Sequence, residues 1–328
     1  MNILVTGGAG YLGSVLVGKL LAENNKVRVL DALMFGGEGI LPFIYHKNFE
    51  FVKGDTRNKE TVLKSLEGVD CVFHLAALVG EPACSVNPSL TEQINHESAV
   101  LVGKSAKENG VERIIFTSTC SNYGISNLDE LATEESPLNP LSLYAETKIA
   151  TEKDLLELSD SSFTVCVLRL ATIFGLSGRM RFNLLINEMV REAYVNKKIL
   201  LYKEDAWRPY AHTQDASDAL ISVLNAESSK INHEIFNMGT ENYQKKGLVE
   251  LVKKYVPDLE IDRQGGLPDN RDYKVSFEKI KRVIGFTPKR KVADGVDELF
   301  WAVKNNVFSN LYDDRYVSWI NEKVLDKL

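Results

Sequence analysis

The sequence of 328 residues predicts a doubly wound α/β fold, in which a parallel sheet is followed by a smaller, mixed α/β lobe. Short apolar runs in the first half, such as ILV, VRVL and RIIF, are typical of strands buried on both faces. These runs alternate with longer segments of helical periodicity, as in successive strand–helix–strand units. The first run leads directly into a glycine-rich turn and a helix, which indicates the start of such a sheet.

The expected strands cover residues 2–6, 26–30, 49–53, 71–75, 113–118 and 164–170, with helices between them at 11–23, 59–66, 88–109 and 143–159. After about residue 174, helical segments at 183–195, 216–226, 247–256, 277–284 and 293–305 are separated by turns and short strands. We therefore assign residues 1–175 to the domain of the parallel sheet, to which some later segments return, and residues 176–328 mainly to a substrate lobe. Ligands in such folds bind where the carboxyl ends of the strands meet the lobe.

Composition narrows the class of protein. Hydrophobic residues make up 44% and charged residues 26%, with a net charge of −6 and no basic run, which argues against nucleic acid as the main partner. No apolar run approaches membrane-spanning length, and the start MNILVTGG enters a strand at once, so we expect neither a membrane segment nor a signal peptide. The 4 cysteines are far apart without a CxxC pair, which predicts a reduced cytoplasmic enzyme without a metal site.

The glycine turn is the first motif that indicates a ligand. Gly7 permits a tight turn after the strand, Gly10 lets the backbone approach a pyrophosphate, and Gly13 lets the helix pack against the strand. Free N–H groups at the helix start then face the phosphate charge. Glycines also mark ordinary turns, but the strand before and the helix after favour dinucleotide binding.

Asp31 follows the second expected strand, where a carboxylate accepts hydrogen bonds from the adenosine ribose hydroxyls. It repels a 2′-phosphate, and no Arg or Lys occupies residues 32–37 to offset that repulsion. We therefore predict NAD rather than NADP as the cofactor; the alternative is an aspartate that only shapes the turn at the strand end.

Four motifs together resemble those of the extended short-chain dehydrogenases, and among them the nucleotide-sugar epimerases and dehydratases. They are the glycine triplet, Gly54 with Asp55, HLAA at 74–77, and Tyr144-xxx-Lys148. WRPYAHTQDAS at 207–217 and DNRDY at 269–273 extend the resemblance over nearly the whole chain. It implies a Rossmann-type domain, a nucleoside-diphosphate sugar as substrate, and a homodimer formed through the helices at 88–109 and 143–159. Further cofactor contacts implied are Tyr11, Leu12, Asp55, Thr56, Leu75, Ala76 and Ala77.

Tyr144 and Lys148 lie one helical turn apart and share a face of the expected helix. A tyrosine has an ordinary pKa of about 10, and a nearby ammonium and an oxidised nicotinamide both lower it. We expect Tyr144 to remove a proton from a sugar hydroxyl while hydride leaves the same carbon for NAD. By resemblance, Lys148 also binds the nicotinamide ribose, and Thr119 shares the hydroxyl proton. A packed tyrosine beside a solvated lysine is the alternative.

Two positions after Thr119 depart from the dehydratases that the chain resembles. Those enzymes carry an Asp-Glu pair there for the elimination of water, whereas this chain has Cys120 and Ser121. We therefore disfavour dehydration. Cys120 is a candidate acid or base near the substrate, although a buried, packed cysteine is favoured over that role.

A nucleoside diphosphate needs local cations, because the chain is acidic on average. Arg179, Arg181, Arg208 and Arg271 are the candidates, and Asn183 is a further ligand candidate. Surface ion pairs are the alternative for any one of the arginines. Trp207 and Tyr210 are candidates for stacking on a base or for the core, and His212 is expected to make a structural hydrogen bond near the lobe interface. Thr172 stands where many relatives have an asparagine that touches the substrate.

The leading hypothesis is oxidation at C4 of a nucleotide-linked sugar, either in a 4-epimerase or in a net 4-dehydrogenase. The strings TEESPLNP, RLATIFG and RMRFN are similar to a bacterial subgroup that includes GDP-heptose 4-dehydrogenases of capsule synthesis. A ketosugar reductase that uses NADPH is an alternative against which Asp31 argues. A non-catalytic NAD-binding scaffold is another, and the retained Tyr144 and Lys148 argue against it.

Overall fold

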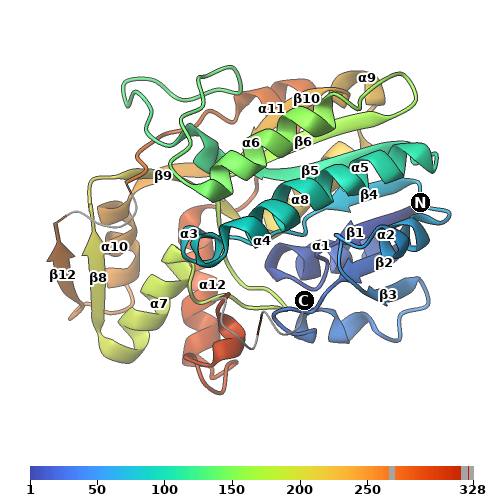
Figure 1. The fold of residues 1–328 in the computed structure, drawn as a ribbon. Helices are drawn as coiled ribbons and strands as arrows, with labels where there is room; N and C mark the ends of the chain where they lie inside the picture. The colour runs from blue at the N-terminus through green and yellow to red at the C-terminus, as the bar shows by residue number, and fades with distance from the viewer. Residues whose placement is uncertain (266–269, 319–323, 325–328) are drawn as a thin grey trace.

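The computed structural model describes residues 1–265, 270–318 and 324, so Asp269 of the DNRDY motif lies outside the described residues. Its main sheet contains seven strands in the order β10-β6-β5-β4-β1-β2-β3, and every neighbouring pair is parallel (Figure 1). The strands are β1 (Asn2–Thr6), β2 (Lys26–Asp31), β3 (Phe49–Lys53), β4 (Cys71–His74), β5 (Arg113–Thr119), β6 (Thr164–Leu170) and β10 (Glu234–Met238). The predicted doubly wound sheet is confirmed, and its seventh strand comes from the second half of the chain.

Helices cover both faces of this sheet because successive strand residues point to opposite sides. Ile3 and Val5 pack into a core with α1 (Tyr11–Ala22), α8 (Thr213–Asn225) and α11 (Glu278–Ile284). Leu4, between them, packs into a core with α2 (Lys59–Leu66), α5 (Ser98–Glu108) and α6 (Leu143–Leu156). Both faces are therefore buried, which explains the continuous apolar runs of the strands.

The single helix expected at 88–109 is instead three consecutive segments. They are α4 (Pro88–Glu92), a wide π-helical turn η2 (Gln93–Glu97) and α5, and the short α3 (Glu81–Val86) precedes them. Within η2, the buried Asn95 amide accepts a hydrogen bond from Leu78 N at 2.7 Å and donates one to Leu78 O at 3.0 Å. The wide turn directs this side chain at the loop after β4, a contact that no local pattern predicts.

The smaller lobe has its own core, in which Phe174, Val190, Leu248 and Leu299 are buried. A three-stranded sheet of order β11-β9-β7 and the pair β12-β8 support it beside α7, α10 and α12 (Figure 1). The bounds are β7 (Thr172–Phe174), α7 (Leu185–Asn196), β8 (Lys198–Tyr202), β9 (Trp207–His212), β11 (Glu241–Gln244), α10 (Lys245–Lys253), β12 (Glu260–Gln264) and α12 (Val292–Lys304). The domain boundary at residue 175 stays a prediction, since α8, β10 and α11 return to the main sheet.

No helix in the described part of the chain is long and apolar enough to cross a membrane.

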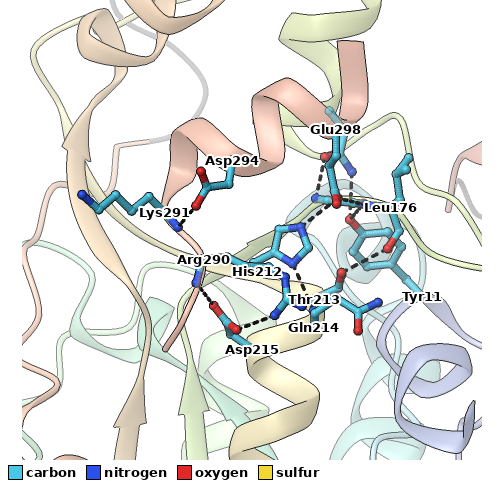
Figure 2. A network of polar contacts seen from close by, with 12 residues as sticks. Tyr11, Leu176, His212, Thr213, Gln214, Asp215, Arg290, Lys291, Asp294 and Glu298 are labelled. Carbon is cyan, nitrogen blue, oxygen red and sulfur yellow. Dashed lines mark hydrogen bonds and ion pairs between the residues drawn. The ribbon is translucent and has the colours of Figure 1, made fainter. Parts of the chain in front are cut away.

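A polar network connects this lobe to the loop after β7 (Figure 2). His212, at the end of β9, accepts a hydrogen bond from Gln214 N through Nδ1 at 3.2 Å, so its proton lies on Nε2. Nε2 then donates to Glu298 Oε1 of α12 at 2.7 Å, and Leu176 N donates to the same oxygen at 2.7 Å. Glu298 thus satisfies a buried ring and a loop amide that lie far apart in the sequence.

We expect Glu298→Ala to lower the free energy of unfolding by about 1–3 kcal/mol, because it leaves two donors without an acceptor. Thermal unfolding of the variant would measure the change. Glu250→Ala removes an exposed carboxylate whose ion pair within the described residues is with Lys253, and it should leave stability nearly unchanged. Equal stability of the two variants would contradict a structural role for Glu298.

Candidate active site

A cleft of about 370 Å³ opens at the carboxyl ends of β1, β4 and β5, where the main sheet meets the smaller lobe. Its volume is in the range of ligand pockets. Most residues expected at the site from the sequence line it, and they come from both halves of the chain. They are Gly7, Gly10, Tyr11, Leu12, Gly13, Asp31, Asp55, Thr56, Leu75, Ala76, Ala77, Thr119, Ser121, Tyr144, Lys148, Thr172, Arg179, Arg181 and Arg271.

The glycine turn forms one wall of the cleft. Gly7 has a φ of 72°, and a Cβ added there would lie 2.7 Å from Ala76 N. A Cβ on Gly13 would lie 2.3 Å from Gly7 O, so a side chain at either position would displace backbone. The first N–H groups of α1 have no helical carbonyl to bind and begin at Tyr11, directly after the turn. This cradle fits the pyrophosphate of a dinucleotide.

Asp31 lies at the end of β2, beside the turn. Its carboxylate accepts hydrogen bonds from Ala9 N at 3.0 Å and Leu33 N at 2.8 Å, which fix its position. Burial raises the pKa of Asp31, and these two bonds together with the positive charge of Arg179 oppose the rise. The carboxylate is therefore held in place for ribose hydroxyls. The positive charge of Arg179 also acts on it, and the prediction missed this charge because it considered only residues 32–37.

Arg179 comes from the loop after β7 and is 5% exposed. Its guanidinium lies 5.0 Å from the Phe35 ring centroid and donates to Ser318 Oγ at 2.9 Å and to Val317 O at 2.8 Å. The charge of Arg181 acts on Arg179 more strongly than that of Asp31, so Arg179 is close to candidates for both substrate and cofactor. Its expected contact with the substrate diphosphate stays a prediction.

Asp55 and Thr56 also line the cleft. Both Asp55 oxygens accept bonds from Arg57, with an ion pair of 2.6 Å, and Thr56 Oγ1 shares a hydrogen bond of 2.9 Å with Ser98 Oγ. The partners hold both side chains in place at the rim, and the expected contact with adenine stays a prediction.

The catalytic candidates converge from β5 and α6. Ser142 Oγ caps α6 by accepting a hydrogen bond from Ala145 N at 3.3 Å, which places Tyr144 in the first turn. Thr119, the last residue of β5, and Tyr144 both line this cleft. Lys148, one turn along α6, is 2% exposed and donates from Nζ to Thr117 O at 2.9 Å. The three side chains therefore line one end of the cleft.

Protein charges act on this group in opposite directions. Burial raises the pKa of Tyr144, and the nearby Arg181 and Arg271 charges and the Thr119 hydroxyl oppose that rise. Burial lowers the pKa of Lys148 to about 8. The sequence predicted a lowered pKa for Tyr144. With protein groups alone its pKa is raised instead, because the buried phenolate would lose its hydration and this effect exceeds that of the nearby charges. A phenolate at neutral pH therefore needs the added positive charge of an oxidised nicotinamide.

Three expected substrate contacts do not line the cleft. Cys120 Sγ is buried, donates to Arg169 O at 3.2 Å and belongs to a buried cluster with Tyr123 and Tyr273. Arg208 is 2% exposed, donates to Trp207 O at 2.7 Å and lies 5.5 Å from the Tyr273 ring centroid. Asn183 Oδ1 accepts a hydrogen bond of 3.4 Å from Arg181 Nε, so Asn183 helps to position that arginine.

The sequence interpretation missed Met34, Phe35 and Ser318, which also line the cleft. The first two directly follow the Asp31 turn, so apolar residues at that place could have indicated a wall for adenine. Ser318 had no such signal, since only its hydrogen bond from Arg179, far away in the sequence, places it at the cleft.

A turn that can hold a pyrophosphate shares this cleft with Thr119 and Tyr144, and that arrangement defines an enzyme acting through a bound dinucleotide. The comparisons agree with this class. The chain belongs to the NAD dependent epimerase/dehydratase family, whose model matches residues 3–239. The cofactor of this family is NAD, as the sequence predicted.

The chain is 28% identical to UDP-glucose 4-epimerase of Lactobacillus helveticus over 92% of its own length and 96% of the relative. It is also 28% identical to UDP-glucuronic acid decarboxylase 6 of Arabidopsis thaliana over 90% and 87% of the two chains. A dTDP-glucose 4,6-dehydratase of Streptomyces venezuelae, solved with NAD bound, superposes with a TM-score of 0.84 at 26% identity, covering 94% and 98%. These relatives act on nucleotide sugars by different overall reactions.

Proposed function

We propose that this protein oxidises C4 of a nucleoside-diphosphate sugar with bound NAD and returns the hydride, as a 4-epimerase. The proposal depends chiefly on Thr119, Tyr144 and Lys148, which line the cleft that also contains the glycine turn. Arg181 and Arg271, which also line that cleft, supply positive charge for the substrate diphosphate. We also propose a homodimer through α5 and α6, which the molar mass in solution would test.

In the proposed reaction, Tyr144 removes the proton of the C4 hydroxyl while the C4–H bond breaks. The cofactor supplies the acceptor for that hydride. Thr119 shares the hydroxyl proton with Tyr144 and orients the sugar, and Lys148 holds its positive charge near the developing phenolate. The ketosugar then rotates within the cleft and presents the other face of its carbonyl to the hydride. Tyr144 returns the proton to the C4 oxygen as that hydride adds.

The burial of Arg179 supports epimerisation over net dehydrogenation. Its bonds to Ser318 and Val317 connect the cleft to the segment at 317–318, which favours retention of the dinucleotide through the cycle. An epimerase needs no exchange of cofactor, whereas a dehydrogenase must reoxidise it.

Dehydration is disfavoured because neither residue after Thr119 supplies a carboxyl group. Cys120 points away from the cleft, and the hydroxyl of Ser121 accepts a hydrogen bond of 2.6 Å from Arg271 Nη1. A part in the synthesis of bacterial surface polysaccharide sugars follows from the resemblance of the sequence strings.

Incubation with UDP- and GDP-linked hexoses, without an added oxidant, tests this function. We expect the C4 epimer to accumulate, as detected by NMR of the sugar, while absorbance of the reduced cofactor stays low. Stoichiometric reduced cofactor with a released 4-ketosugar would establish the dehydrogenase instead, and a 4-keto-6-deoxy sugar the dehydratase. Failure to convert or bind any nucleotide sugar would contradict the proposal altogether.

A further inference from the structure

We propose that Glu152 is a positioning residue of the active site, whose buried carboxylate fixes α6 against β5 and β6 and keeps Lys148 as an ammonium beside Tyr144. The inference concerns how the chain maintains the Tyr–Lys pair, and it rests on the proposed function only for the roles of these two residues.

Glu152 connects α6 to three other elements. Its Oε1 accepts hydrogen bonds from Ser118 Oγ, from Asn122 Nδ2 at 2.8 Å and from Arg169 Nε at 3.0 Å. Its Oε2 accepts from Arg169 Nη2 at 2.7 Å, and both partners of this ion pair have side chains only 4% exposed. Ser118 directly precedes Thr119, so the carboxylate sets the distance between the strand that holds Thr119 and the helix that holds Tyr144.

Glu152 also lies one helical turn after Lys148, which itself follows Tyr144 by one turn. Side chains at this spacing share a face of the helix. The Lys148 ammonium lies 4.6 Å from the Phe116 ring centroid and 5.9 Å from the Tyr144 ring centroid, so it has little water around it. An ammonium in such surroundings needs a nearby negative charge.

Three other titratable groups lie near Lys148 or act on it in the described residues, and none of them is a carboxylate. His74 of β4 is buried and neutral, since burial first and the Lys148 charge second lower its pKa to about 3. Burial raises the pKa of Tyr144 of α6, and Cys84 of α3 acts on the pKa of Lys148 in the same direction as Glu152 and more strongly. Glu152 is therefore the carboxylate that favours the charged form of Lys148 against its burial.

Arg169 balances the charge of Glu152 without reaching Lys148 in the contacts described. Its Nη1 donates to Tyr123 Oη at 3.0 Å, and Tyr123 Oη donates to Asn237 Oδ1 at 2.8 Å. The pair is thus anchored to β10 on the far side, which holds it rigid. Because every oxygen of Glu152 is bonded, the carboxylate cannot turn away when α6 moves.

The test is the titration of Lys148 itself, followed by NMR of protein with ¹³C at the lysine Cε. The Lys148 resonance is assigned by its absence in Lys148→Met. In Glu152→Gln we expect the pKa of Lys148 to fall by about one pH unit, as the loss of one nearby buried charge implies. This readout needs no substrate, so its failure differs from a failure of the proposed function.

Two further variants separate charge from geometry. Glu152→Asp keeps the charge but shortens the reach, so it should leave the Lys148 titration near that of the wild type and lower kcat severalfold. If Glu152→Gln does not fold, Glu152→Gln with Arg169→Gln leaves no unpaired buried charge, and it should show a smaller downward shift because the positive charge of Arg169 is removed as well.

The control is Glu60→Gln, which removes an exposed carboxylate from α2 on the same side of the sheet. It should change neither the titration nor kcat. An unmoved Lys148 titration in a folded Glu152→Gln or double variant would overturn the proposal, and so would a Glu152→Asp variant that shifts as far as Glu152→Gln.

Discussion

Tyr144→Phe should lower kcat by about 1000-fold, because it removes the only atom of this residue that can take the C4 hydroxyl proton. The ring stays, and it packs with the apolar cluster of Leu78, Cys84 and Ile94, so the cleft keeps its shape. Binding of NAD should therefore be nearly unchanged. The measurement is turnover of a nucleotide sugar together with NAD affinity, so that chemistry and binding are separated.

Tyr45→Phe is the matched control, since Tyr45 is 100% exposed and should have no effect. A Tyr144→Phe variant that keeps more than about a tenth of the wild-type kcat would rule out Tyr144 as the base, given the usual size of such contributions. The expected loss applies to an epimerase and a dehydrogenase alike, because both begin with the same oxidation.

Gly13→Ala should weaken NAD binding by about 100-fold, which corresponds to about 2.7 kcal/mol. The added Cβ would lie 2.3 Å from Gly7 O and 2.7 Å from Gly8 Cα, and both atoms belong to the turn that holds the pyrophosphate. The backbone must move away, and the N–H groups at the start of α1 move with it. Calorimetric titration with NAD measures the change, and thermal unfolding should also show a loss of about 1–3 kcal/mol.

Gly18→Ala is a control in the same helix, because its added Cβ meets only the end of the Phe43 ring, at 3.1 Å. A ring can turn where a carbonyl in a tight turn cannot, so NAD affinity should stay the same. Equal affinities for the Gly13→Ala variant and the wild type would show that the pyrophosphate does not lie on this turn.

The parts of this site that were predictable from the sequence are those in which neighbouring residues decide the geometry. The glycine turn and the Tyr144–Lys148 pair each lie within one strand–turn–helix or one helix, where spacing alone determines which atoms meet. The wide turn η2 was missed for the opposite reason. This turn is accompanied by the hydrogen bonds of Asn95 to Leu78. The hydrophobic pattern of residues 88–109 cannot predict a contact with a residue outside that segment.

The sequence by itself determined the class of fold, the cofactor and the expected position of the Thr–Tyr–Lys group, because each depends on short-range order along the chain. Only the tertiary structure decided that Arg179 donates to Ser318, that Cys120 points away from the cleft, and that Glu152 pairs with Arg169. The physical reason is the same in each case. A charge or a thiol acts on what lies near it in space, and in a doubly wound sheet the ends of distant strands become neighbours.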